Sequence, residues 1–192
     1  MVTERVPDAV RCADPFHIVK WATDALDAIR RKAWNRARSR AETRSLAKAV
    51  KRSRWVLWKN PENWTDRQRA KIDWIAKIDP VLYRGWMLKE GLRAVFAAED
   101  FPSAREALTS WLAWAQRSRI SEFVDLGRRV KGQLGPILAS LEHGISNALT
   151  ESVNTKIKLL QRQAFGFRDP ENLIALMLLH LGGHRPELPG RH

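Results

Sequence analysis

Apolar residues recur every three or four positions through most of this 192-residue chain, which is the spacing of amphipathic helices and not of strands. Several helix starts carry their own signals, because a capping side chain or a proline precedes the apolar stripe. These signals are Asp14-Pro15, Thr65 with Gln68, Asp79-Pro80 and Pro102-Ser103. Further helices are predicted from Ser121, with an interruption at Gly135-Pro136, and over residues 148–163 and 170–181. The pattern predicts a mostly α-helical fold.

One short segment departs from the helical pattern. Residues 9–13 form an apolar run of the kind that a buried strand uses, and they are the only strand that we expect. Asp14 follows this run and precedes Pro15, so its simplest role is to cap the next helix. The carboxyl end of a strand is also where open sheets present ligands and catalytic groups. Both roles are therefore open to Asp14.

The basic residues are concentrated in one segment. The chain has 34 Lys and Arg against 21 Asp and Glu, a formal charge of +13. Eleven of the basic residues, but only one acid, Glu42, lie between Arg30 and Arg54. Alanines separate these charges, so we predict one continuous helix from Pro15 to Asn60 with cations around most of its circumference. The lack of balancing acids favours contact with DNA phosphates over an ordinary solvated face or an arm that is disordered when alone.

Composition excludes several protein classes. The single cysteine, Cys12, rules out an internal disulfide and a multi-cysteine zinc site. The first residues have no apolar core for a signal peptide, and the longest apolar run, residues 173–179, is far short of the roughly 20 residues that span a bilayer. We expect a soluble cytoplasmic protein with a nucleic-acid partner and no membrane. For the nine tryptophans, packing is favoured over base stacking.

A second carboxylate stands out near the end of the chain. Glu151 lies one turn into the predicted helix over 148–163, whose opposite face is apolar. It is followed on that helix by three cations, Lys156, Lys158 and Arg162. This arrangement is suited to hold a metal ion beside a phosphate backbone. The alternative is a surface ion pair, which is weakened because the residues three and four places on are uncharged.

Four stretches of the chain resemble segments of one protein family. Residues 14–20 (DPFHIVK) and 25–35 (ALDAIRRKAWN) are similar to its second catalytic segment. Residues 146–167 (SNALTESVNTKIKLLQRQAFGF) resemble its third, and 58–64 (WKNPENW) are similar to a middle segment. The family is the DDE transposases of bacterial insertion sequences in the ISL-three group, and the resemblance extends from about residue 8 to residue 181.

The resemblance implies an RNase H-like α/β domain that cleaves and joins DNA strands with bound Mg²⁺. Asp14 would be its second catalytic carboxylate and metal ligand, and Glu151 its third. Residues 1–183 would form the C-terminal portion of that domain, with one residual strand, a helical insertion over 15–145 and the glutamate-bearing and last helices over 146–183. Residues 184–192 would be a loose tail. In a nucleoid-associated enzyme, the ends of the insertion sequence would be contacted by seven cations: Arg30, Arg31, Lys32, Arg36, Lys156, Lys158 and Arg162.

The family's first aspartate, on an earlier strand, has no counterpart here. We therefore expect a truncated transposase chain that is inactive alone. The alternative is a non-catalytic DNA-binding or dimerising fragment that modulates full-length transposase, through a homo-oligomer or a mixed complex. A weaker alternative is a misfolded pseudogene product.

Overall fold

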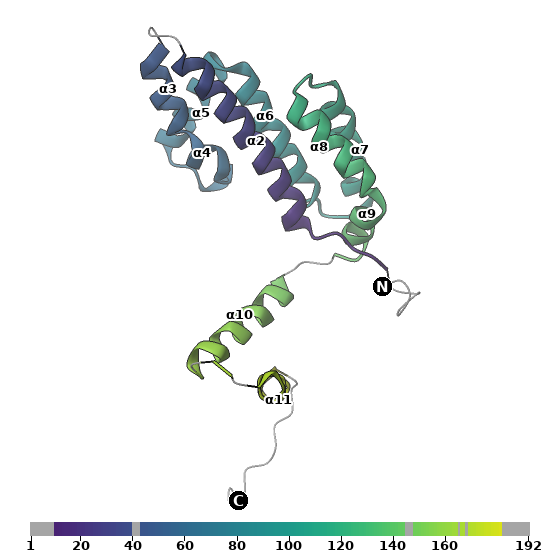
Figure 1. Cartoon of the computed structure of the whole chain (residues 1–192). Coiled ribbons are helices and arrows are strands. Elements are labelled where there is room, and N and C mark those ends of the chain that lie inside the picture. Colours follow the sequence, from purple (N-terminus) through teal and green to yellow (C-terminus); the bar gives the residue numbers. More distant parts are fainter. Residues whose placement is uncertain (1–9, 40–42, 145–147, 165, 168, 182–192) are drawn as a thin grey trace, which may run out of the picture. The chain divides into compact units, whose positions relative to one another are not determined.

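A computed structural model of the chain describes residues 10–39, 43–144, 148–164, 166–167 and 169–181. The chain divides into two compact units, Met1–Ile145 and Ser146–His192, and each is described by itself (Figure 1). The first unit contains α2 (Pro15–Arg38), α3 (Arg44–Lys51), α4 (Arg54–Trp58), the short 3-10 helix η2 (Pro61–Asn63), α5 (Asp66–Ile78), α6 (Pro80–Val95), α7 (Phe101–Arg117), α8 (Ser121–Gly132) and α9 (Leu134–Glu142). The second contains α10 (Ala148–Gln163) and α11 (Pro170–Leu181).

The mostly α-helical prediction is confirmed, but the predicted strand is wrong over its described part. Residues 10–13 have no regular secondary structure. The N–H of Ala13 donates a hydrogen bond to the carbonyl of Pro136 on α9, at 2.9 Å. A strand needs a neighbouring strand for its backbone hydrogen bonds, and no strand occurs among the described residues. An apolar run alone therefore does not form one.

The predicted continuous helix from Pro15 to Asn60 is also wrong, because the basic segment folds into a hairpin. Helix α2 ends at Arg38, and α3 packs back against it (Figure 1). The Oγ of Ser39 donates to the carbonyl of Arg36 at 2.8 Å, and the Oγ1 of Thr43 donates to the carbonyl of Ala37 at 2.7 Å. These bonds satisfy carbonyls that the end of a helix leaves without partners. The segment therefore has a buried side and an exposed side.

Most of the predicted helix starts are confirmed. Asp14 and Asp79 cap α2 and α6, and Thr65 with Gln68 forms the capping box of α5. Helix α7 starts one residue earlier than predicted, with Asp100 as its cap. The helix interruption predicted at Gly135-Pro136 occurs slightly earlier, because α8 ends at Gly132 and α9 begins at Leu134. Pro136 therefore lies in the first turn of α9, where a proline is tolerated.

The core of the first unit lies where α2 packs against α6 and α8. Its fully buried side chains include Leu26, Leu82, Leu88 and Phe123. Gly85 on α6 allows a close approach to α2, since a Cβ at this position would lie 2.8 Å from the Cδ1 of Ile29. The α2–α6 packing at this point therefore leaves no room for a side chain at position 85 unless Ile29 moves.

We expect Gly85→Leu to lower the free energy of unfolding of the first unit by about 1–3 kcal/mol, because a leucine must displace packed core atoms. All nine tryptophans lie between residues 21 and 114, so urea unfolding followed by tryptophan fluorescence reports on this unit. Gly132→Leu is the matched control, since a Cβ at Gly132 would meet nothing within 4 Å. Equal unfolding midpoints for the two variants would contradict the close-approach argument.

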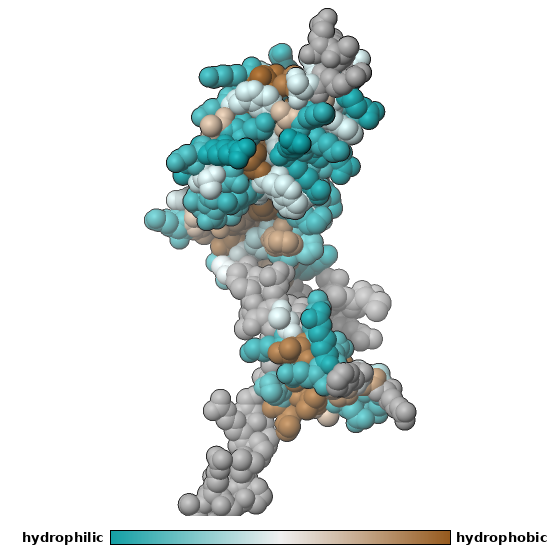
Figure 2. All heavy atoms as spheres, turned by 90° about the vertical axis from the view of Figure 1, so that its left-hand side faces the viewer, coloured by the Kyte–Doolittle hydropathy of each residue, from teal (hydrophilic) through white to brown (hydrophobic). Residues whose placement is uncertain are grey.

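The second unit agrees with the helices predicted over 148–163 and 170–181. Several of its apolar side chains are exposed, including Leu159, Ile174 and Leu178. Figure 2 shows brown, hydrophobic atoms gathered on this unit. In the part of the chain that the structure describes, no helix is long and apolar enough to cross a membrane.

Candidate nucleic-acid interface

Asp14, the first predicted catalytic carboxylate, makes local contacts with both of its oxygens. Its Oδ1 accepts a hydrogen bond from the N–H of Phe16 at 2.9 Å, which caps α2. Its Oδ2 pairs with the Nδ1 of His17, whose side chain is exposed. The capping role is therefore observed. The catalytic role stays a prediction, and a metal ion at this position would share the carboxylate with His17 and the helix end.

Glu151, the second predicted carboxylate, lies in the first turn of α10, and its side chain is outside the described residues. Lys156, Lys158 and Arg162 are exposed on the same helix. Asp14 belongs to the first unit and Glu151 to the second. Among the side chains that the structure describes, no three His, Cys, Asp or Glu residues are grouped so that they could hold a metal ion. Mg²⁺ binding by Asp14 and Glu151 stays a prediction.

The four predicted DNA-binding cations of α2 all have acidic partners. Arg30 and Arg31 both pair with Asp27, each at 2.8 Å. The Arg30 and Asp27 side chains are only 9% and 6% exposed, so this pair is part of the folded core. Lys32 and Arg36 pair with Glu122 and Asp79, at 2.6 and 3.1 Å. These cations are therefore partly neutralised before any DNA is bound.

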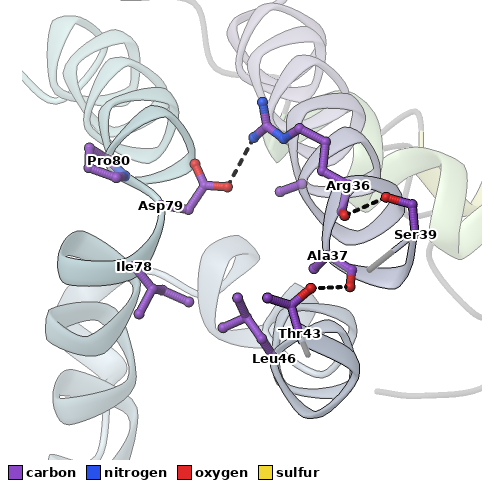
Figure 3. A pocket seen from close by; sticks show the side chains of 9 residues that line it. Arg36, Ala37, Ser39, Thr43, Leu46, Ile78, Asp79 and Pro80 are labelled. Carbon is purple, nitrogen blue, oxygen red and sulfur yellow. Dashed lines mark hydrogen bonds and ion pairs between the residues drawn. The ribbon is translucent and has the colours of Figure 1, made fainter. Parts of the chain in front are cut away.

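The partners of Lys32 and Arg36 come from distant parts of the chain. Burial raises the pKa of the Glu122 carboxyl, but hydrogen bonds from Lys32, from its own backbone N–H and from Ser121 outweigh burial and hold that pKa below its ordinary value. The Glu122 carboxylate is therefore the charged form that faces Lys32 at neutral pH. Figure 3 shows Arg36 reaching from α2 to Asp79, the residue that caps α6, across a pocket of about 390 Å³. Both pairs tie α2 to other helices.

A different set of cations surrounds a groove between α2, α3 and α4. We call this the cationic groove; its volume is about 660 Å³. Among the described residues, none of its Lys48, Lys51, Arg52 or Arg54 side chains forms an ion pair, and the side chains that line the groove include no acid. Figure 2 faces the side on which α3 and α4 lie, and this side is mostly hydrophilic. The lining residues are Arg30, Arg31, Trp34, Lys48, Lys51, Arg52, Arg54 and Trp55.

Two tryptophans form the aromatic part of the groove. Trp34 on α2 lies under Arg38 and Lys51, with 5.0 and 5.6 Å from the cationic atoms to the ring centre. Trp55 on α4 is 70% exposed, whereas Trp111 in the core is 3% exposed. A surface with unpaired cations and an accessible aromatic ring is suited to bind a polyanion that also carries flat rings.

Comparison with known proteins identifies the family. A sequence profile described as "Transposase", of the ISL3 group of DDE transposases, matches residues 1–177. The chain belongs to this family. The resemblance to ISL3 transposases is thereby confirmed, whereas the assignment of residues 14–20, 25–35 and 146–167 to catalytic segments stays a prediction. No solved structure matches this ISL3 transposase chain.

Curated relatives of this transposase chain come from two bacterial genera. The transposases for insertion sequence element IS1557 of two Mycobacterium tuberculosis strains are each 53% identical over 210 aligned residues, covering 100% of this chain and 47% of the relative. The transposase for insertion sequence element IS1001 of Bordetella parapertussis is 30% identical over 166 residues, covering 86% of this chain and 40% of the relative. The ISL3 transposase chain thus spans about half the length of the relatives that it matches.

Sequence reasoning placed Lys48, Lys51, Arg52 and Arg54 in the basic segment of this ISL3 chain but did not single them out as a site. One signal was available, because the first three are spaced so that they share a face of a helix. A second signal was Asp27, which precedes Arg30 and Arg31 by three and four residues and can pair with either.

Proposed function

We propose that this chain supplies part of a DNA transposase that cleaves and joins DNA strands at the ends of an insertion sequence in the bacterial nucleoid. The observation that carries the proposal is the cationic groove in a chain of the transposase family. Asp14 caps the start of α2, and the same helix carries Arg30, Arg31 and Trp34 in the groove. The same helix therefore joins a candidate metal ligand to a candidate phosphate-binding surface.

The proposed roles divide between the two units. Asp14 and Glu151 hold divalent cations, and Lys156, Lys158 and Arg162 contact DNA phosphates close to Glu151. When bound, a pair of Mg²⁺ ions would polarise the attacking and leaving oxygens of the phosphodiester. His17 orients the Asp14 carboxylate through its Nδ1, and the N–H of Phe16 fixes the other oxygen. On this proposal, the two units are helical parts of an RNase H-like domain, and the sheet of that domain, with the first aspartate, is supplied from outside the described residues.

We expect the 192-residue chain alone to cleave no DNA strand, because two carboxylates leave a pair of divalent cations short of charged oxygen ligands. The test incubates the purified chain with Mg²⁺ or Mn²⁺ and an end-labelled duplex that carries the ends of the insertion sequence, followed by a denaturing gel. Asp14→Ala is the matched control for contaminating nuclease. Cleavage that the Asp14→Ala variant lacks would contradict the inactivity, and it would support Asp14 as a catalytic residue.

A second candidate function is a non-catalytic DNA-binding fragment that acts on full-length transposase, through a mixed complex or a homo-oligomer. The groove favours this candidate because its residues all lie in the first unit and do not depend on Glu151. DNA binding without cleavage, together with inhibition of a full-length transposase added to the same reaction, would support it.

A further inference from the structure

Trp55 is more exposed to solvent than any of the other eight tryptophans. Its side chain is 70% exposed, although a tryptophan ring left in water forfeits a large part of the free energy that its burial would provide. It lies at the edge of the cationic groove, next to Arg54. A ring in this position is accessible to a partner that can cover it.

The ring of Trp55 is held in place by contacts with Arg54 and Trp58. The guanidinium of Arg54 lies 4.0 Å from the ring centre of Trp58 and 5.6 Å from that of Trp55. Trp55 and Trp58 meet edge to face, with ring centres 5.9 Å apart and planes at 74°. Such contacts restrict the orientation of the ring and leave most of its surface exposed. The exposed indole is therefore oriented in advance for stacking.

The surroundings of Trp55 fit a nucleotide and not an apolar ligand. Six of the eight residues that line the groove are Lys or Arg, and its volume of about 660 Å³ is in the range of sites that hold small organic groups. In a duplex the base faces are stacked on one another, so only an unpaired base can stack on a protein ring. Phosphates on either side of that base would reach the unpaired cations Lys48, Lys51 and Arg52.

We propose that the cationic groove binds single-stranded DNA, with an unpaired base stacked on Trp55 and the adjacent phosphates on Lys48, Lys51, Arg52 and Arg54. This inference rests on the proposed function in taking DNA as the ligand. What it adds is that the DNA bound in the groove is single-stranded. Arg54 binds phosphate and also positions Trp55 through the Trp58 contact.

The test measures the affinity of the full chain for a labelled oligothymidine of about 12 nucleotides and for a duplex of the same length, by fluorescence anisotropy at one salt concentration. Trp55→Ala should weaken single-strand binding about 10- to 100-fold and duplex binding less than about 2-fold, because stacking needs an unpaired base. Trp55→Phe should retain most of the single-strand affinity. Trp114→Ala is the matched control, since Trp114 is partly exposed on α7 and does not line the groove.

The outcomes separate this inference from the proposed function. Equal loss of single-strand and duplex binding in Trp55→Ala, or no loss of single-strand binding, overturns the stacking proposal and leaves DNA binding by the groove intact. Failure of the chain to bind either DNA overturns both. The single-stranded oligonucleotide should also quench tryptophan fluorescence. Quenching that disappears in Trp55→Ala and persists in Trp114→Ala supports the stacked base directly.

Discussion

Replacing Lys48, Lys51 and Arg52 by glutamate is expected to weaken duplex DNA binding by about 10²–10³-fold near 0.1 M salt. These three side chains are exposed, and none has an acidic partner among the described residues, so each is available to a phosphate. Each phosphate contact that is lost lowers the magnitude of the slope of log K against log salt by about 0.9, so the triple variant should lose up to about 3. Fluorescence anisotropy across a salt series measures both quantities.

Two other triple variants carry the same change of charge and test whether position matters. Arg105, Arg117 and Arg128 lie on α7 and α8 and are exposed, so their replacement by glutamate alters total charge without altering the groove. We expect this control to weaken binding by less than about 10-fold. The variant of Arg31, Lys32 and Arg36 should fall between the two, because these cations already pair with acids. Equal losses in all three variants would show that binding follows net charge and not the groove.

The second large effect is on stability. Asp27→Ala is expected to lower the free energy of unfolding of the first unit by about 3–5 kcal/mol, because it leaves the Arg30 guanidinium buried without its counter-charge. Asp27 accepts hydrogen bonds from the Nε atoms of Arg30 and Arg31, both at 2.8 Å, and neither Asp27 nor Arg30 has access to much water. Urea unfolding followed by tryptophan fluorescence measures the change.

Two comparisons test the cause of this loss. Asp24→Ala removes an exposed carboxylate from the same helix. Among the described residues this carboxylate forms an ion pair with Lys20 alone, so its loss should change the free energy of unfolding by less than about 0.5 kcal/mol. Adding Arg30→Met to Asp27→Ala removes the buried cation and should restore most of the stability. If the double variant is no more stable than Asp27→Ala, the loss does not arise from an uncompensated charge.

Features of the fold that depend on neighbouring residues in the sequence could be predicted. The caps at Asp14 and Asp79 and the capping box of Thr65 are local hydrogen bonds, so their signals are complete within four residues. The turn after Arg38 could not be predicted, because alanine and arginine both favour a continued helix. Packing of α3 against α2 overrides that preference, and packing depends on residues that no local pattern connects.

The candidate site was predictable only as a segment of charge. Asp27 could be matched to Arg30 and Arg31 from the sequence, but Asp79 and Glu122 approach Arg36 and Lys32 only in the folded chain. The groove likewise exists only because α3 and α4 return to α2. The strand predicted before Asp14 is wrong because a strand also depends on a distant partner. An apolar run forms a strand only when a second strand lies beside it, and the described residues contain none.

Helix α2 also fixes the distance between Asp14 and the cationic groove. Asp14 and Trp34 are separated by 20 residues of one helix, which at 1.5 Å per residue places them about 30 Å apart along its axis. DNA rises 3.4 Å per base pair, so this spacing corresponds to about nine base pairs. On the proposed function, α2 acts as a spacer of fixed length. The number of residues in the helix would set the distance between the DNA bound beside Trp34 and the phosphodiester cleaved beside Asp14. Adding a turn to α2 would increase that distance by about 5.4 Å, or between one and two base pairs.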